Sequence, residues 1–412
     1  MGGLFDIVVD DWVTRVPSLM TGSDGASVAT RAEWLGRRDA LVALFAEHVY
    51  GITPAFPSVL NVRPAAEPVA CLGGSARLEQ LTVSFDAAGE YQADVAIFMP
   101  VQAADPVPAV VFLNWFGNQS VLNDSDILTT MRRLPELTFP GLPRFGDHAT
   151  DDTRGVHAQH LPIGLLVDAG IAVVTCYYGD FAVDDPHRSG DGIRQLARQH
   201  VAQPAPGREW GVVGIWAWGM SRLRDLLTRL PEIDQKRVAV AGHSRLGKAA
   251  LWAAAQDPRF SIAFANGSGA VGASLCRHLS GESIADINTN YPHWFCTNFH
   301  AYNGAEDRLP IDQHALLAAI APRPIYISGG LDDDWADPAG EYLSARLAQP
   351  AYDLYGLVGI PSGQRPAVGR SIGETIGYHV RPGGHALTPL DWQLFLDFAS
   401  KHRAAYIGCA PA

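Results

Sequence analysis

The chain has 412 residues, of which 47% are hydrophobic and 18% are charged, so it is long enough to bury a large core. Its formal net charge is −12 and it has no run of lysines or arginines, which argues against nucleic acid or an anionic membrane surface as a partner. No apolar stretch reaches the length that spans a bilayer, and no basic region followed by an apolar block marks a signal peptide at the N-terminus. Five cysteines without a C-x-x-C pair predict neither a zinc ribbon nor a dense disulfide framework.

Residues 1–60 are predicted to form an N-terminal extension that packs on the rest of the chain. Within it, residues 31–50 carry apolar side chains at helical spacing, which predicts a packing helix. A proline-rich stretch comes next and favours a surface linker. Its prolines are Pro54, Pro57, Pro64 and Pro68.

Strands and helices alternate through the rest of the chain. The predicted strands cover residues 81–85, 91–98, 109–113, 171–177, 238–241, 262–265 and 324–328. The predicted helices cover residues 161–169, 211–230, 249–255, 314–320, 339–347 and 390–402. Residues 123–160 lack a clear period and are expected to be an insertion near the functional site. The alternation predicts a mostly parallel central sheet with helices on both faces, a three-layer α/β sandwich, and we expect residues 1–412 to form one catalytic domain.

The segment from Arg237 to Lys248 places a serine between a strand and a helix. Ser244 lies in the sequence GHSRLG, so it is expected on a sharp turn between a short apolar strand and a helix-forming run. The alternative is a Gly-Ser turn without chemistry. A strand, a serine turn and a helix together are typical of the nucleophile elbow of α/β-hydrolases, where the helix N-terminus favours negative charge. The pattern departs from G-x-S-x-G because Leu246 stands at the position of the second glycine.

A serine hydroxyl is a weak nucleophile at neutral pH, so it needs a base and a group that orients the base. In α/β-hydrolases the order along the chain is serine, acid, histidine. The candidate base is His385, in a loop whose glycines at 383 and 384 free the backbone to aim the imidazole at Ser244. A loop histidine without a role is the alternative. His379 is the rival candidate, but it lies on the strand side of the loop and is expected to pack.

The acid is expected on the loop after the strand 324–328, where four aspartates compete. Asp333 is the favoured candidate. Asp332 and Asp334 are alternatives, and at most one of these carboxylates can hold the histidine while the others cap helices or face solvent. Asp337 precedes Pro338, as the N-cap residue of the next helix would.

Short motifs spread along the chain carry a family resemblance. They are Gly242–Ala249 (GHSRLGKA), Gly281–Glu282, Tyr291–Phe295 (YPHWF), Leu309–His314 (LPIDQH), Ala321–Pro324 (APRP), Trp335–Pro338 (WADP) and Gly383–His385 (GGH). Together they resemble the glucuronoyl esterases, carbohydrate esterase family fifteen, and most closely the bacterial branch. The resemblance covers about residues 100–400 and is specific because of the Ser-Arg-x-Gly-Lys elbow.

The resemblance implies an α/β-hydrolase fold and a serine esterase without a metal or an organic cofactor. The implied reaction is hydrolysis, through an acyl-enzyme, of esters between 4-O-methyl-glucuronic acid on glucuronoxylan and lignin alcohols. By position, Ser244 would be the nucleophile and His385 the base, and Arg245 would offer its backbone N–H and its guanidinium to the oxyanion. The resemblance also implies secretion or a periplasmic location.

Three further residues are implied to bind the sugar. Lys248 would bind sugar hydroxyls, while Glu282 and Trp335 would line the glucuronoyl pocket. Without the resemblance, Lys248 could equally be a solvated helix lysine, Glu282 a surface residue and Trp335 a core or lid aromatic. The histidines show no spacing typical of a metal site.

The sequence departs from the family pattern at one position. Many members carry the catalytic glutamate after the strand that follows the elbow helix, and Gly267 stands there in this chain. Some bacterial members instead hold an acid two residues before the pocket tryptophan, which matches Asp333 beside Trp335. The resemblance therefore favours Asp333 as the acid.

Two alternatives to a glucuronoyl esterase stay open from the sequence. One is a deacetylase, similar to an acetyl xylan esterase, on the same fold. The other is a triad-impaired protein that binds glucuronoxylan without turnover, an alternative suggested by Gly267. In the enzymatic interpretations the partner is glucuronoxylan or a lignin-carbohydrate ester, and we expect the protein to be a monomer.

Overall fold

The computed structural model describes Phe5 and residues 9–22, 24–56, 61–101, 105–135, 146–202 and 204–402. The chain forms two compact units. Unit 1 comprises Met1–Ile52, Pro204–Gly214 and Ala241–Ala412, and unit 2 comprises Thr53–Gln203 and Ile215–Val240. The chain crosses between them inside α5 (Val212–Leu227) and β6 (Ile233–His243). The expectation of one domain, with an extension at 1–60 and an insertion at 123–160, stays a prediction.

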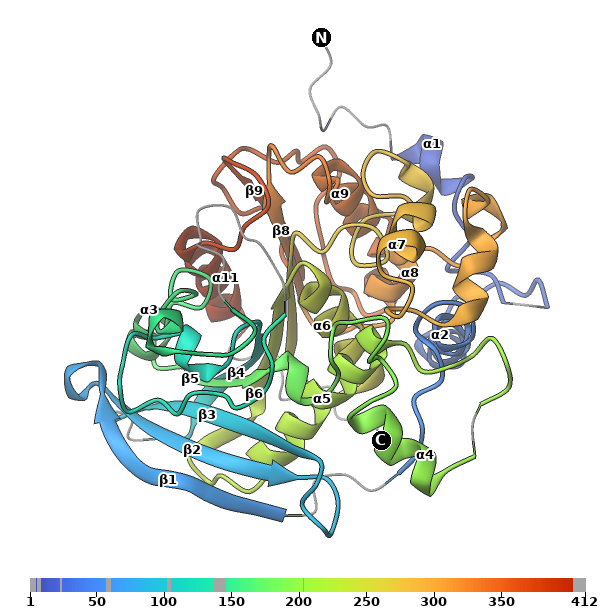
Figure 1. Cartoon of the computed structure of the whole chain (residues 1–412). Helices are drawn as coiled ribbons and strands as arrows, with labels where there is room; N and C mark the ends of the chain where they lie inside the picture. The colour runs from blue at the N-terminus through green and yellow to red at the C-terminus, as the bar shows by residue number, and fades with distance from the viewer. Residues whose placement is uncertain are drawn as a thin grey trace. The chain divides into compact units, whose positions relative to one another are not determined.

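Unit 2 is built on strands that run antiparallel along most of its sheet. Its strand order is β1-β2-β3-β5-β4-β6, and Figure 1 shows β1, β2 and β3 side by side as long curved ribbons. The first four of these strands pair antiparallel, and β4 pairs parallel to β5. The strands are β1 (Asn61–Cys71), β2 (Ala76–Ser84), β3 (Gln92–Pro100), β4 (Val107–Asn114) and β5 (Ala172–Tyr177).

The predicted linker is wrong for the prolines at 64 and 68, which lie inside β1. The strand is at the edge of the sheet, and its register against β2 shifts between Pro64 and Ala66 and again between Ala66 and Val69. An edge strand with bulges tolerates proline because only one side of its backbone needs donors. The strand also spans residues with no period-2 hydrophobic pattern, so no strand was predicted there. Pro57 lies outside the described residues.

Unit 2 also contains α3 (Ile163–Asp168), α4 (Ile193–His200) and most of α5. The sequence predicts an amphipathic helix here, but every residue from Val212 to Ser221 is buried, so the first half of α5 is covered on all sides. Trp216, Met220 and Leu223 are among its buried apolar side chains. The Trp216 indole donates to the backbone oxygen of Ala182 at 3.1 Å, so this large ring is buried without losing its hydrogen bond.

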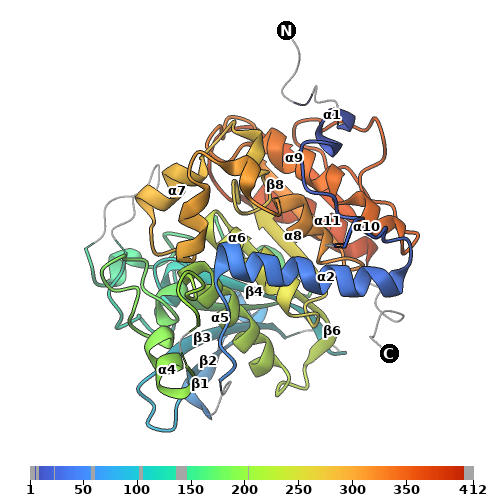
Figure 2. The same ribbon diagram turned by 90° about the vertical axis from the view of Figure 1, so that its right-hand side faces the viewer.

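In unit 1, the N-terminal helices pack on the helices of the C-terminal half. α1 (Asp10–Val13) is short, and α2 (Arg31–Phe45) ends in a π-helical turn, Ala46–Tyr50. α2 buries Trp34, Leu41 and Phe45, and Figure 2 shows it beside α8 (Gln313–Ala318). Its N-terminus is closed by a capping box, in which the Thr30 hydroxyl accepts from Glu33 N–H and the Glu33 carboxylate accepts from Thr30 N–H.

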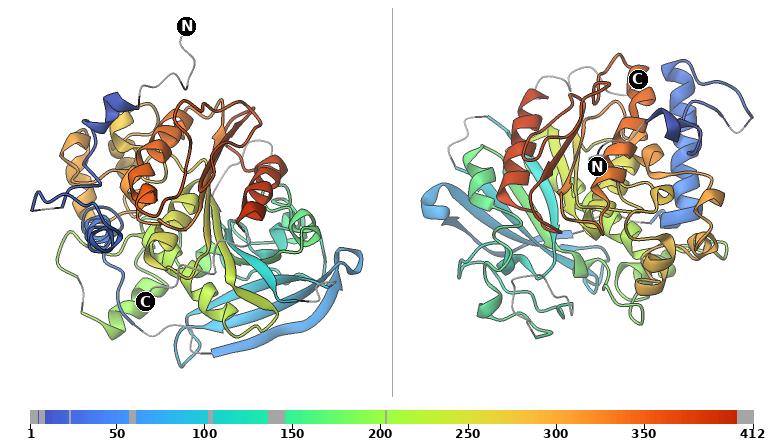
Figure 3. Two further views of the ribbon diagram at one scale, coloured as in Figure 1. Left: turned by 180° about the vertical axis from the view of Figure 1, so that it is seen from behind. Right: turned by 90° about the horizontal axis from the view of Figure 1, so that it is seen from above.

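The strands of unit 1 are parallel. β7 (Ile262–Asn266), β8 (Ile325–Gly330) and β9 (Ile376–Arg381) follow the end of β6 in the strand order. Figure 3 shows α9 (Pro338–Leu347) and α11 (Pro389–Lys401) on opposite sides of β8 and β9. The remaining helices of this unit are α6 (Arg245–Gln256), α7 (Ile284–Asn290) and α10 (Gln349–Asp353).

In this parallel arrangement, the carboxyl ends of β6, β7, β8 and β9 lie at the same edge of the sheet. Ser244 follows β6, Gly267 follows β7, and the loops after β8 and β9 carry Asp333 and His385. The Ser244 N–H donates to the backbone oxygen of Asn266 at 2.9 Å, which ties the end of β6 to the end of β7. In open parallel sheets, the carboxyl ends of the strands are where ligands bind. No helix within the described ranges is long and apolar enough to cross a membrane.

We expect Thr30→Ala to lower the free energy of unfolding of unit 1 by about 1 kcal/mol, because an N–H at the start of α2 loses its acceptor. Chemical denaturation measures this change. Thr289→Ala is the matched control, since that exposed hydroxyl donates to the Ala285 oxygen and caps no N–H group. Equal effects of the two substitutions would contradict the capping argument.

Candidate active site

Ser244 lies on a strained turn between β6 and α6. Its φ of +57° and ψ of −129° are rare for a residue with a side chain. A Cβ at residue 242 would come within 2.0 Å of the Leu246 backbone oxygen, so only glycine fits before the turn. Leu246, at the position of the missing motif glycine, is fully buried, and Gly247 makes the close approach to Ser268 instead. The departure from the motif therefore leaves the elbow intact.

His385 faces the serine. Its Nε2 lies 2.9 Å from Ser244 Oγ, within hydrogen-bond distance. The imidazole is about one-third exposed, with a side-chain accessibility of 34%, so a ligand and water can reach it. The loop that carries it follows β9, which the sequence did not predict as a strand.

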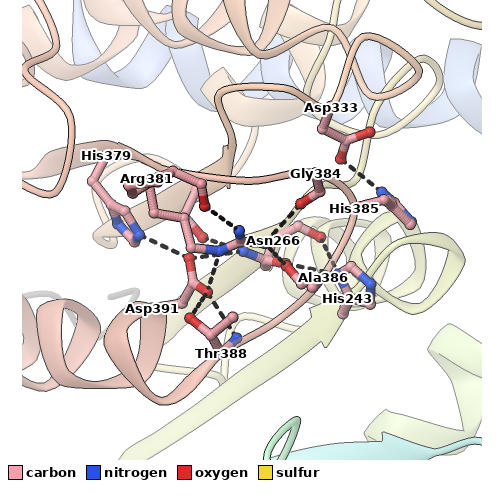
Figure 4. A network of polar contacts seen from close by, with 12 residues as sticks. His243, Asn266, Asp333, His379, Arg381, Gly384, His385, Ala386, Thr388 and Asp391 are labelled. Atoms are coloured by element: carbon pink, nitrogen blue, oxygen red, sulfur yellow. Dashed lines mark hydrogen bonds and ion pairs between the residues drawn. The ribbon is translucent and has the colours of Figure 1, made fainter. Parts of the chain in front are cut away.

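Asp333 contacts the imidazole through its other ring nitrogen, and Figure 4 draws this contact as a dashed line. Its Oδ2 is 2.7 Å from His385 Nδ1, and its side chain is only 2% exposed. Asp332 accepts from Gly383 N–H and Asp334 is exposed. Asp337 caps α9 by accepting from Gly340 N–H, which confirms its predicted role. Of the four aspartates, Asp333 is the one whose carboxylate contacts His385.

Gly267 explains how the acid can come from a different strand. A Cβ at this position would lie 3.4 Å from both His385 Nδ1 and Asp333 Oδ2. A side chain from residue 267 would therefore approach the same edge of the imidazole that Asp333 occupies. Because residue 267 has no side chain, the Asp333 carboxylate can occupy that edge of the imidazole.

His379, the rival base, is fully buried away from the serine. Its Nε2 lies 2.9 Å from Asp391 Oδ1, and its Nδ1 lies 2.8 Å from the Tyr326 hydroxyl. The prediction that it packs in the interior is confirmed.

Arg245 directly follows the serine, and its guanidinium lies over two aromatic rings. Its Cζ is 4.7 Å from the centroid of Trp294 and 5.2 Å from that of Tyr291. The two rings stack on each other, with centroids 3.8 Å apart and planes 7° from parallel. The two rings limit where the guanidinium can lie without neutralising its charge. The sequence contained this pair in the YPHWF motif, but neither its stacking nor its contact with Arg245 could be inferred from spacing.

Lys248 is buried under the site. Its ammonium donates to the Ser268 oxygen at 2.8 Å and to the Ala270 oxygen, which occupy two of its three N–H groups. Burial lowers the pKa of Lys248, and the negative charge of Glu282 opposes that shift. The alternative of a solvated helix lysine is excluded by this burial, while a role in binding sugar stays a prediction.

Glu282 is also buried, and its Oε1 has no hydrogen-bond partner among the described residues. Burial raises the pKa of its carboxyl, and the positive charges of Lys248 and Arg245 oppose the rise. The Glu282 N–H donates to the Trp335 oxygen at 3.2 Å. The Trp335 side chain is 53% exposed, so it is not a core residue. Glu282 and Trp335, which are predicted to line one pocket, therefore lie on segments that are hydrogen-bonded to each other.

Glu341, on α9, was not singled out from the sequence because nothing marked it among the polar residues of an amphipathic helix. It is fully buried, and its Oε1 accepts from Ser268 Oγ at 3.0 Å and from Gly269 N–H at 2.9 Å. Burial raises the pKa of Glu341 to about 8, against these two hydrogen bonds, which lower it. Lys248 and Glu341 therefore hold the segment after β7 from two sides.

Across the part of the chain that the structure describes, no three His, Cys, Asp or Glu side chains are placed to hold a metal ion. Four of the cysteines, Cys71, Cys176, Cys276 and Cys296, are buried free thiols.

A serine on an elbow, a histidine within hydrogen-bond distance of it and a buried aspartate behind the histidine are the arrangement of a serine hydrolase. The order Ser244, Asp333, His385 along the chain is that of the α/β-hydrolases.

Comparisons with known proteins narrow this class. A family model described as "Glucuronyl esterase, fungi" matches residues 159–356. The structure resembles a promiscuous CE15 esterase from a marine bacterial metagenome, with 36% identity, a TM-score of 0.87 and coverage of 94% of this chain and 96% of that one. It also resembles a glucuronoyl esterase from Solibacter usitatus, with 34% identity, a TM-score of 0.86 and coverage of 94% and 98%.

A 4-O-methyl-glucuronoyl methylesterase from Phanerochaete chrysosporium is 31% identical over 202 residues. The match covers 46% of this chain and 41% of that protein. The chain belongs to the glucuronoyl esterases of carbohydrate esterase family 15. The predicted family, the α/β-hydrolase fold and the carboxylic ester hydrolase class are confirmed.

We expect Asp333→Asn to lower kcat about 10⁴-fold with little change in KM, because an amide cannot hold the same imidazole tautomer or stabilise the imidazolium. Steady-state hydrolysis of a glucuronate ester measures both constants. Asp334→Asn is the matched control on the same loop and should keep nearly full activity, since its side chain is exposed. Near-native turnover of Asp333→Asn would mean that another carboxylate serves.

Glu341 should make stability depend on pH. Its carboxyl has a pKa of about 8 in the folded chain and the ordinary value of 4.5 when unfolded, so between these values the folded state holds a proton that the unfolded chain has lost. The contribution of Glu341 to stability should therefore be largest below the lower value and fall as pH rises toward 8, by at most about 1.4 kcal/mol per pH unit.

Glu341→Gln removes that titration and keeps a carbonyl oxygen for both donors. Its stability relative to wild type should rise between about pH 5 and pH 8 and stay level above that range. Thermal or urea unfolding of both proteins across this range measures the difference. Parallel stability curves for the two proteins would show that Glu341 is not protonated in the folded state.

Proposed function

We propose that this chain is a serine esterase that hydrolyses the ester bond between (4-O-methyl-)glucuronic acid of glucuronoxylan and an alcohol, as in lignin-carbohydrate esters. The observation that carries the proposal is the hydrogen-bonded series from Ser244 Oγ through His385 to Asp333, at 2.9 and 2.7 Å. The glucuronoyl and 4-O-methyl-glucuronoyl names of the relatives supply the substrate class.

In the first step, Ser244 Oγ attacks the ester carbonyl while His385 Nε2 takes its proton. The bond between the carbonyl carbon and the alcohol oxygen then breaks, and the alcohol leaves with the proton from His385. Asp333 keeps Nδ1 protonated and stabilises the imidazolium that forms between these events. The product of this step is a glucuronoyl ester of the serine.

In the second step, water enters beside the partly exposed imidazole and gives a proton to His385 Nε2 as its oxygen attacks the acyl carbon. The bond to Ser244 Oγ breaks, the proton returns to the serine, and glucuronic acid is released. No other group has to supply or accept a proton.

Arg245 is proposed to stabilise the oxyanion of both tetrahedral intermediates. The substrate ester is neutral, so the negative charge develops only as the bond to Ser244 forms. A permanently charged guanidinium, oriented by Tyr291 and Trp294, favours that charged state over the ground state. The N-terminus of α6 adds its dipole at the same point.

Lys248, Glu282 and Trp335 are proposed to bind the sugar. Lys248 has one N–H group beyond those that bond to the two carbonyls, and the buried Oε1 of Glu282 is an acceptor for a sugar hydroxyl. The exposed indole of Trp335 offers an apolar face for a pyranose ring. Filling the acceptor of a buried carboxylate with a substrate hydroxyl gives strong discrimination against sugars that lack it.

The alternative of a triad-impaired binding protein is disfavoured, because His385 lies within hydrogen-bond distance of both Ser244 and Asp333 despite Gly267. Deacetylation of xylan uses the same triad and stays the second candidate, since a relative of 36% identity is described as promiscuous. We also propose that the protein acts as a monomer outside the cytoplasm, where a cell-wall polysaccharide is accessible.

We expect Ser244→Ala to abolish alcohol release from a benzyl glucuronate ester, because no other nucleophile occupies the elbow. Chromatography of the released alcohol measures the loss, and full activity of this variant would overturn the proposal.

With wild-type enzyme, methyl glucuronate should be cleaved faster than acetylated xylan. Faster release of acetate would favour the second candidate.

A further inference from the structure

The loop that carries His385 has little in its own sequence to hold it. It runs from Pro382 to Leu387, between β9 and α11, and contains two adjacent glycines, of which Gly383 has a φ of +90°. Glycine gives a backbone many accessible conformations, so other groups must hold the loop in one of them. The hydrogen bonds of the imidazole orient the ring but do not hold the backbone on either side of it.

Arg381, the last residue of β9, bonds to the backbone on both sides of His385. Its Nη2 donates to the Gly384 oxygen at 2.9 Å and also to the Ala386 oxygen. Its Nη1 donates to the Pro382 oxygen at 2.8 Å. Figure 4 shows the guanidinium of Arg381 beside the carbonyls of Gly384 and Ala386 and the carboxylate of Asp391. The planar fork of an arginine is suited to such multiple bonding, whereas lysine offers a single point charge.

The guanidinium is in turn anchored by Asp391, in the first turn of α11. Asp391 is fully buried, and its Oδ2 accepts from Arg381 Nε at 2.9 Å and from Thr388 N–H at 2.8 Å. Burial raises the pKa of Asp391, but the hydrogen bond and charge of His379 and the charge of Arg381 lower it more, so the carboxylate is ionised. A buried pair of this kind holds its geometry because neither charge has an alternative partner in water.

The same carboxylate is linked to the nucleophile. Asp391 Oδ1 accepts from Asn266 Nδ2 at 3.2 Å, and Asn266 Oδ1 lies 2.7 Å from Nδ1 of His243, the residue before the serine. The Asn266 backbone oxygen accepts from Ser244 N–H at 2.9 Å. One buried carboxylate thus connects the backbone that carries the nucleophile with the backbone that carries the base.

We propose that Arg381, anchored by Asp391, is a positioning residue that sets the distance between the imidazole of His385 and the hydroxyl of Ser244. Its guanidinium bonds to loop carbonyls and to Asp391, so it acts on His385 through the loop. The inference rests on the proposed triad chemistry and is independent of which ester the enzyme prefers.

A purely structural role is the competing explanation, and the chain offers a matched control for it. Arg277 is a buried arginine paired with the fully buried Asp312, at 3.1 Å, and its other bonds go to the backbone oxygens of residues 307, 309 and 311. It has the same chemistry as Arg381 but braces a different loop. Loss of either arginine should lower stability to a similar extent.

The test compares Arg381→Met, Arg381→Lys and Arg277→Met with wild type. A misplacement of about 1 Å costs about 100-fold in rate, so Arg381→Met should lower kcat about 100-fold with KM changed less than about 3-fold. Arg381→Lys should fall between Arg381→Met and wild type. Arg277→Met should keep kcat within about 3-fold of wild type while its melting temperature falls as much as that of Arg381→Met.

Proton NMR adds a readout that needs no substrate. The far-downfield resonance of the His385 Nδ1 proton, bonded to Asp333, should weaken and exchange faster in Arg381→Met and remain in Arg277→Met. If the two methionine variants lose the same small amount of kcat and both keep the resonance, Arg381 is a structural residue and the proposal is wrong.

Two further outcomes are also decisive. If Arg381→Met does not fold, Arg381→Lys settles the question, because wild-type kcat in that variant would overturn the proposal. If wild type hydrolyses no ester, the proposed function fails, while the NMR comparison still tests the positioning of His385.

Discussion

The site depends on one imidazole held from two directions. His385 needs a proton on Nδ1 and an open acceptor on Nε2, and the buried carboxylate of Asp333 enforces that tautomer at 2.7 Å. The Asp333 carboxylate is shielded from water, which strengthens its interaction with the imidazole. The imidazole itself is partly exposed, so its Nε2 stays accessible to the ester and to water. Three features surround this ring. They are the strained turn at Ser244, the loop carbonyls that accept hydrogen bonds from Arg381, and the space left by Gly267.

Positively charged side chains lie around the triad, although the protein as a whole has a negative net charge. The chain carries a net charge of −12, yet Arg245 and Lys248 gather beside the nucleophile together with the buried Glu282. Net charge governs encounter with large partners, while catalysis depends on fixed charges within a few ångströms of the reacting atoms. A protein that is acidic overall can therefore stabilise an oxyanion, since contacts with Tyr291 and Trp294 hold the half-buried Arg245 cation beside the nucleophile.

Apolar runs were predictable from the sequence as helices or buried strands according to their length. The helix 211–230 appears as α5 and the strand 171–177 as β5, because the first run is long enough for a helix and the second is a short continuous run typical of a strand buried on both faces. β1 was mistaken for a linker because prolines suppress strand signals, although an edge strand tolerates them. β9 was missed because it is buried on both faces and short, with Gly377 and His379 interrupting its apolar residues.

By itself, the sequence determined the elbow serine, the histidine between glycines and a loop of four candidate acids, because these are local patterns whose order along the chain identifies the class of enzyme. Only the tertiary structure decided which aspartate contacts the imidazole, that Lys248 is buried, that Tyr291 and Trp294 stack under Arg245, and that Arg381 and Asp391 brace the histidine loop. The contact between Asp333 and His385 joins residues 52 positions apart in the chain. Such contacts depend on how parallel strands and their loops pack at one edge of a sheet, and no spacing within a single segment carries that information.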